Sequence, residues 1–367
     1  MGREGRGPPG FAAATGKCLN RKHLAMFLGV AALALAIAYA VWRWRESGFD
    51  WNEFAASLKH ADWTWLTLGA ALVLATYLGR ALRWEVMLRP LVKNASLWRI
   101  LTATAIGFTA VVLFGRAGEP VRPYLIAKKE GVTFSSQIAA WIVERMLDLL
   151  MVLLVFGVAL TQVSSSAIQP GPKTRVILEA GGYTAGIVGA VSLALLIALR
   201  QFRGGMQQRL LNVLSFLPAK ALGRVRTVLA SFEEGMQSTR QTSFTLLLVF
   251  YTVAEWSVIA GAFWCVCRAF PATANLGLAD VVILLGFVAF GSAVQIPGVG
   301  GGMQIATVLV LTEFFGVSLA AASGIALVLW MISFVMIVPF GLALAFHEGI
   351  QWRNLRHLEP EGEGKPT

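Results

Sequence analysis

Long apolar runs with few charges dominate this sequence and decide the solvent in which it folds. A helix of about 20 apolar residues crosses the hydrocarbon core of a bilayer. Runs of about that length lie at 24–42, 63–82, 138–160, 177–199, 243–265 and 319–346. Only 14% of the residues are charged, compared with about 25% in soluble proteins. The sequence therefore predicts an all-α integral membrane protein with six full transmembrane helices.

Two further apolar stretches, 98–115 and 280–316, are interrupted by glycine and proline. Cytoplasmic loops of membrane proteins are rich in Lys and Arg. Five, four and seven basic residues lie in 80–99, 116–130 and 200–242, but only three, two and one in 43–62, 161–176 and 265–280. All basic-rich segments are cytoplasmic only if 98–115 enters the bilayer from the cytoplasm and returns. We therefore predict a re-entrant hairpin there.

The same alternation makes 280–316 a second re-entrant hairpin, which enters from outside and has its tip at 297–302. The run 24–42 leads into Trp42-Arg43-Trp44-Arg45 instead of a small-residue cleavage site, so we expect a retained span and no signal peptide cleavage. The predicted membrane domain is 24–346, between a cytosolic basic tail (1–23) and a cytosolic disordered tail (347–367).

An internal repeat relates the two hairpins. A shift of 185 residues places Gly115 on Gly300, Glu119 on Gln304, and Gly131-Val132-Thr133 on Gly316-Val317-Ser318. The predicted units, about 98–160 and 280–346, have opposite orientations, and inverted repeats with broken helices are a transporter architecture. The insert at about 200–242 alternates basic and apolar residues; it is either an amphipathic segment on the anionic leaflet or a solvated connector.

Charged residues inside an apolar run are the sharpest functional signal, because each costs roughly 2.5–3.5 kcal/mol on insertion scales and needs a partner or a function. Glu144, Arg145 and Asp148 lie in the run that begins at 138, with Glu144 and Asp148 on one helical face. They form either an ion pair that holds helices together or a site for a headgroup or a proton. Glu255 lies in the middle of another run and must be protonated or paired.

The tip of the first hairpin carries Arg116, Glu119 and Arg122. Two guanidinium groups are suited to grip a phosphate, and Glu119 would balance an Arg when no ligand is bound. Glycines and prolines allow sharp turns and prevent a regular helix there: Gly115, Gly118 and Pro120 in this tip, and Pro297, Gly298, Gly300 and Gly301 in the second. The alternative is a loop whose arginines extend to the interface.

Arg80 and Arg83 lie at the cytoplasmic end of the run 63–82 and are read either as site residues or as anchors at the interface. Tryptophans cluster at the ends of runs, Trp63, Trp84 and Trp98 among them, which indicates an interfacial belt and not a nucleic-acid platform. Cys265 and Cys267 lack metal-ligand spacing, and the glycine run 298–302 lacks GK[ST]. We therefore expect no metal, no cofactor and no nucleic acid.

Several motifs together resemble the flippase-like family named after the transmembrane region of bacterial lysylphosphatidylglycerol synthases. They are Arg80 and Arg83-Trp84, the stretch Phe114 to Tyr124, Gly131-Val132, Val143 to Asp148, and Pro297-Gly298-x-Gly300-Gly301. The resemblance covers about 20–350 and implies a multi-pass protein of the bacterial inner membrane with a role in phospholipid, hopanoid or envelope-lipid handling. The sequence departs from the family pattern at two points. The chain ends at Thr367, so we expect no aminoacyl-transferase domain in it. Trp330 stands where the resemblance implies an Arg.

The residues and the resemblance together predict translocation of an anionic lipid by a protein that is more a transporter than an enzyme. Arg116, Arg122 and Arg145 would bind the headgroup, with Glu119, Glu144 and Asp148 as counter-charges; Arg80, Arg83, Glu255 and Gln304 complete the predicted site. Two alternatives stay open. One is a membrane enzyme that acts on a lipid phosphate, with Glu144 or Asp148 as base. The other is a non-catalytic partner that presents lipid to an envelope-lipid enzyme.

Overall fold

A computed structural model describes residues 49–165, 219–235, 242–292, 295–296 and 300–349, with short pieces between 182 and 213. The chain divides into two units, Met1–Asp50 and Trp51–Thr367, and the elements below belong to the second. Several predicted segments lie outside the described residues. They are the tail 1–23, the span 24–42, most of the span 177–199, and the tail 347–367 beyond residue 349.

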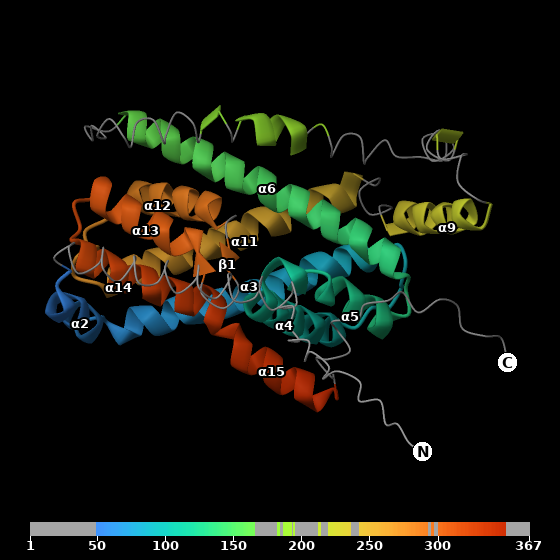
Figure 1. Cartoon of the computed structure of the whole chain (residues 1–367), viewed down its shortest axis with the longest axis horizontal. Helices are drawn as coiled ribbons and strands as arrows, with labels where there is room; N and C mark the ends of the chain where they lie inside the picture. The colour runs from blue at the N-terminus through green and yellow to red at the C-terminus, as the bar shows by residue number, and fades with distance from the viewer. Residues whose placement is uncertain are drawn as a thin grey trace, which may run out of the picture. The chain divides into compact units, whose positions relative to one another are not determined.

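The described chain is helical apart from two strands of two residues each (Figure 1), so the predicted all-α fold is confirmed. In chain order the elements are α2 (Trp51–Lys59), α3 (Trp63–Leu88), α4 (Leu97–Phe114), the 3-10 turn η1 (Gly115–Gly118), α5 (Val121–Glu130), α6 (Phe134–Ser165), α9 (Ala219–Gly235), α11 (Thr242–Ala269), α12 (Leu278–Gly291), β1 (Gln295–Ile296), β2 (Gly300–Gly301), α13 (Gly302–Glu313), α14 (Leu319–Trp330), the π-helical turn η2 (Met331–Val335) and α15 (Ile337–His347).

Within the described residues, 4 helical stretches are long and apolar enough to cross a membrane: Trp63–Leu88, Leu97–Gly118, Ser243–Ala269 and Leu319–His347. Large apolar side chains on these and neighbouring helices are exposed, such as Leu154 at 60%, Phe250 at 64% and Ile305 at 68%. Exposed apolar surface on this scale is expected where lipid tails cover it. The prediction of a multi-pass membrane protein is therefore confirmed, and the number of spans stays a prediction.

The first predicted hairpin is a pair of antiparallel helices, α4 and α5. Near the open end, Arg99 Nε on α4 donates to Glu130 Oε1 on α5 at 2.9 Å. Closer to the tip, Gly107 lies directly against Arg122, where any side chain on Gly107 would collide. Gly115 ends α4 with a φ of 63°, a conformation that glycine adopts without strain. By length and composition α4 is able to cross a membrane, but α5 returns along it.

The second predicted hairpin is also a pair of antiparallel helices, α12 and α13. Gly291 at the end of α12 lies against Ala306 and against the backbone of Gly302, at the start of α13. Between the helices, β1 pairs antiparallel with β2, Gln295 with Gly301. Pro297 and Gly298, which were predicted to shape this tip, lie outside the described residues.

The two hairpins open toward opposite ends of the described helices, and their tips meet. Lys129, at the open end of the first hairpin, bonds to Glu348 after α15. At the other end, Ser318 at the start of α14 bonds to Glu53 of α2. Between these ends, Cα atoms of β1 lie within 8 Å of η1. The described parts of the two glycine-rich breaks are therefore neighbours.

The motif shared by the two predicted repeat units has the same local geometry in both. Gly131 and Gly316 adopt φ values of 68° and 63°. Two residues later, the hydroxyl of Thr133 accepts from Ser136 N, and the hydroxyl of Ser318 accepts from Ala321 N. Both motifs thus end one helix and cap the next. The repeat itself stays a prediction.

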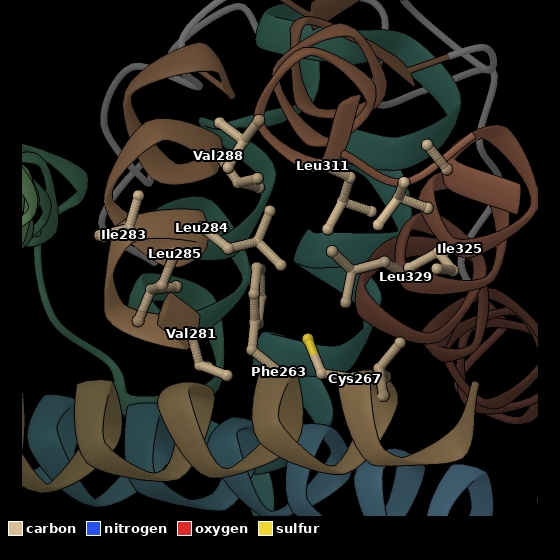
Figure 2. Packing of buried hydrophobic residues seen from close by; sticks show 14 of the residues in the cluster. Phe263, Cys267, Val281, Ile283, Leu284, Leu285, Val288, Leu311, Ile325 and Leu329 are labelled. Carbon is tan, nitrogen blue, oxygen red and sulfur yellow. The ribbon is translucent and has the colours of Figure 1, made fainter. Parts of the chain in front are cut away.

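Two apolar clusters hold the helices together. The first joins α11, α12, α13 and α14, and Figure 2 shows Cys267 in it beside Phe263, Leu284 and Leu329. The second joins α3, α4, α5 and α6 and contains Trp84 and Ile106. On α6, Val143 belongs to the second cluster and Phe156 to the first, so the stretch between them bridges the two.

Helix α9 lies within the predicted amphipathic insert and packs on α6, with Gly235 directly against the backbone of Ser136. Leu222, Val225, Leu229 and Phe232 are partly covered, whereas Arg226 and Val228 are exposed. An apolar stripe at this spacing is the buried face of an amphipathic helix. Its position against the membrane surface stays a prediction.

Candidate functional site

Arg83 lies at the centre of a buried network that joins three helices. Its Nη1 donates to Asp148 Oδ1 at 2.7 Å and its Nη2 to Glu144 Oε1 at 2.8 Å, both on α6. Nη1 also donates to Thr252 Oγ1 of α11 at 3.1 Å. The Arg83 side chain is 0% exposed, so Arg83 ties α3 to α6 and α11 without contact with solvent.

Arg122 brings the first hairpin into the same network. Its Nη1 donates to both carboxylate oxygens of Glu144, at 2.9 and 3.0 Å, and its Nε donates to Thr104 Oγ1 at 3.2 Å. Its Nη2 donates to the carbonyl of Arg80 at 3.1 Å. The guanidinium lies 4.1 Å from the centre of the Trp84 ring, a distance at which the ring face attracts a cation.

Arg80, Glu255 and Arg145 complete the network. Arg80 pairs with Glu255 at 2.8 Å, and Arg83 is 3.6 Å from the other oxygen of Glu255. Arg145 lies 3.4 Å from Glu144 and 3.5 Å from Asp148, and its side chain is 33% exposed. Glu255, which the sequence required to be protonated or paired, is therefore paired.

We call these seven residues the charged cluster: Arg80, Arg83, Arg122, Arg145, Glu144, Asp148 and Glu255. The cluster lies between the two apolar clusters, near the middle of α6 and α11 and toward the C-terminal end of α3. It contains four guanidinium groups and three carboxylates, so with every group ionised the cluster carries one excess positive charge. Burying ions at such a depth is strongly unfavourable unless they are paired and hydrogen-bonded, and the contacts above supply that pairing.

The tip of the first hairpin carries its own ion pair, in which Arg116 Nη1 donates to Glu119 Oε1 at 2.8 Å. Arg116 is 59% exposed and Glu119 14%. Glu119 thus balances an arginine, as the sequence suggested. Gly118 lies directly against the carbonyl of Ala110, and Pro120 precedes the first residue of α5, so both residues hold the sharp turn.

In the second hairpin, Gln304 Oε1 accepts from Gly301 N at 2.7 Å and so caps the start of α13. Gly301 has a φ of 118°, and it and Gly300 form β2. These three predicted site residues therefore shape the second tip. A direct role in binding stays a prediction for Gln304.

Several residues of the site were missed or misread from the sequence. Trp84 is fully buried and donates to Gln137 Oε1 at 2.9 Å, so its assignment to the interfacial belt is wrong, although Trp63 and Trp98 are exposed at 71% and 65%. The reading of Arg83 as an interfacial anchor is wrong for the same reason. Thr104 and Thr252 gave no sequence signal, because a hydroxyl in an apolar run is common.

Among the described residues, no group of three or more His, Cys, Asp and Glu side chains is placed to hold a metal ion. Cys265 and Cys267 are buried and free, and Cys267 packs within the first apolar cluster. The chemistry of the described site is therefore that of guanidinium and carboxylate groups.

Long apolar helices that enclose a buried cluster of arginines and carboxylates define a polytopic membrane protein with a polar centre. The family model of the lysylphosphatidylglycerol synthase TM region matches residues 26–341, and the chain belongs to that family. The resemblance seen in the sequence motifs is thus confirmed. No curated protein and no solved structure was found to match the chain. Membership in this family links the protein to lipid handling in the membrane.

Proposed function

We propose that this protein moves an anionic phospholipid between the leaflets of the bacterial inner membrane, and that the charged cluster meets the lipid headgroup. The observation that carries this proposal is the cluster itself: seven ionisable side chains, with an excess of one positive charge, lie together where apolar helices meet. A charged group at membrane depth is expensive and marks a functional site by default.

The rest of the site supports the same function. Arginine is the residue best suited to bind phosphate, because its planar group donates two parallel hydrogen bonds. The tip pair, Arg116 and Glu119, lies on the turn that touches the second hairpin. In this proposal the two hairpins are re-entrant, the six spans include 24–42 and 177–199, and both tails are cytoplasmic. The two tips form the gates.

The proposal also accounts for the exposed apolar surface. The acyl tails of a lipid can remain in the bilayer against side chains such as Leu154 and Phe250, while the headgroup passes through the protein. Reaction chemistry is less well supported, because both oxygens of Glu144 accept bonds from Arg122. A carboxylate held in this way is stabilised as an anion and is a poor general base.

The test is movement of labelled phosphatidylglycerol in vesicles that contain the purified protein. Label in the inner leaflet should become accessible to a reagent added outside, at a rate well above that of protein-free vesicles, with the total amount of each lipid unchanged. Altered lipid composition would instead indicate an enzyme. Vesicles that show neither lipid movement nor lipid turnover would contradict the proposal. They would favour the alternative of a non-catalytic partner that presents lipid to another enzyme.

Arg116→Gln is expected to slow this movement by at least about tenfold, the equivalent of about 1.4 kcal/mol in the barrier, because an exposed headgroup contact at the tip is lost. The protein should stay folded, since Arg116 is 59% exposed. Arg89→Gln is the matched control: Arg89 is a 44% exposed arginine that pairs with Glu85 at the end of α3. Equal rates for the two variants would exclude Arg116 from the site.

The proposed topology is tested by cysteine labelling in a chain that carries Cys18→Ser, Cys265→Ala and Cys267→Ala. Asn94→Cys and Lys128→Cys, which flank the first hairpin and are exposed, should react with an impermeant reagent only from the cytoplasm. Ala272→Cys, before the second hairpin, should react only from the other side.

These positions avoid the tips themselves. Gly118 has no room for a side chain, and Gly301 has a φ that favours glycine, so a cysteine at either would distort the region that it reports on. Labelling of Asn94→Cys and Lys128→Cys from opposite faces would rule out a re-entrant first hairpin.

A further inference from the structure

The four arginines of the charged cluster are not equivalent. Arg83 and Arg122 are 0% and 5% exposed and bond to carboxylates at 2.7 to 3.0 Å. Distances near 2.8 Å are typical of strong charge-assisted hydrogen bonds. Their Nη atoms are therefore held by the protein, although the buried Nε of Arg83 has no hydrogen-bond partner within the described residues, and a ligand would have to break these Nη bonds to reach them.

Arg145 differs in both respects. Its Nη2 lies 3.4 Å from Glu144 and 3.5 Å from Asp148, and 33% of its side chain is exposed. Within the described part of the chain, its Nε has no hydrogen-bond partner. A guanidinium that makes only long contacts with carboxylates and is one-third exposed, at the margin of a buried ionic network, has the capacity to accept a further anionic ligand.

The charge of the cluster indicates how much negative charge such a ligand carries. Glu144, Asp148 and Glu255 balance three of the four arginines and leave one positive charge over. A ligand with one negative charge brings the cluster to neutrality, whereas a ligand with two leaves an excess negative charge that is costly to hold away from water. A phosphodiester carries one negative charge, and a phosphomonoester carries about two at neutral pH.

We propose, on the basis of the function above, that Arg145 is the arginine that contacts the lipid phosphate, and that the cluster selects a singly charged phosphodiester over a phosphomonoester. Arg83 and Arg122 are positioning residues: they hold Glu144 and Asp148, which in turn hold Arg145. Arg80 occupies an intermediate place, with a side chain that is 17% exposed and paired to Glu255.

The test is thermal stabilisation of the full chain in detergent by three short-chain lipids: phosphatidylglycerol, phosphatidic acid and diacylglycerol. A ligand that binds the folded state raises the midpoint of unfolding. At about pH 7.5 phosphatidylglycerol should raise it, phosphatidic acid should need a concentration at least about tenfold higher, and diacylglycerol should have no effect. Equal potency of the two phospholipids would overturn the charge argument.

Lower pH provides an internal control, because the second pKa of a phosphomonoester is about 6. At about pH 5 phosphatidic acid is singly charged and should approach phosphatidylglycerol in potency. Phosphatidylglycerol, whose charge does not change over this range, should keep the potency that it has at about pH 7.5. Weaker phosphatidylglycerol binding at low pH would show that the protein's own groups titrate and would remove the basis of the proposal.

Arg145→Gln should fold. It should need a phosphatidylglycerol concentration at least about tenfold higher for the same stabilisation, which corresponds to about 1.36 kcal/mol of binding free energy. Arg145→Lys should recover part of it, because it restores the charge but not the planar donors. Arg89→Gln serves as the control. Undiminished binding by Arg145→Gln, in a protein whose wild type still moves lipid, would refute the role of Arg145 and leave the proposed function intact. Failure of the wild type to move any lipid would refute the function instead.

Discussion

Arg83→Gln is expected to destabilise the folded protein by about 3–5 kcal/mol, the typical effect of removing one partner from a buried ion pair. The change leaves Glu144, Asp148 and Glu255 with less compensation for their charge. Arg122 and Arg145 cannot replace the lost bonds, because among the arginines of the charged cluster it is Arg83 that hydrogen-bonds from α3 to both α6 and α11. The measurement is the midpoint of thermal unfolding in detergent, followed by tryptophan fluorescence.

Arg89→Gln provides the matched control, on the same helix and with the same change of side chain. Arg89 and Glu85 form an exposed i, i+4 pair at 3.0 Å, and such pairs contribute about 0–1 kcal/mol. The two variants should therefore differ by several degrees at least in their midpoints. Similar midpoints would mean that the charged cluster is open to water and not buried.

Gly118→Val is expected to give the second large effect, because it forces a side chain into the carbonyl of Ala110 in the tip of the first hairpin. Overpacking of this kind typically costs about 1–3 kcal/mol through shifts of the backbone. Here the shift displaces η1, which lies beside β1, so lipid movement in vesicles should fall sharply even where the protein still folds.

Gly79→Val is the control for this change, since a Cβ at Gly79 meets nothing within 4 Å. It should leave both the midpoint of unfolding and the rate of lipid movement close to those of the wild type. If Gly118→Val behaves like Gly79→Val, then the tip is free to rearrange and the contact between the two hairpins has no part in the gating proposed here.

The sequence predicted the presence of the helices better than the residues at which they end. The second run was expected to stop at residue 82, because a hydropathy window closes where Arg83 enters it. The helix continues to Leu88, since Arg83 finds carboxylates on another helix and does not need the interface. The paired helices of the two hairpins were predictable because glycine and proline act locally, whereas their re-entrant course, inferred from the Lys and Arg distribution, stays a prediction.

The partners within the site were not predictable in the same way. Asp148 and Thr252, which bond to Arg83, are 65 and 169 residues away in the chain. The sequence around Arg83 contains no signal that identifies them as its partners. Trp84 shows the same limit. A tryptophan beside arginines at the end of an apolar run has the pattern of an interfacial residue, and only tertiary packing reveals that its ring stacks on Arg122.

The order of the residues around Arg83 has a consequence for synthesis of the protein. Its first carboxylate partner, Glu144, follows it by 61 residues, so α3 is complete before any group able to neutralise it has been made. An arginine without a partner in an apolar helix opposes insertion, by roughly 2.5–3.5 kcal/mol at the helix centre and by less toward a helix end such as that of Arg83. We therefore expect the newly made α3 to insert less readily alone than together with α6.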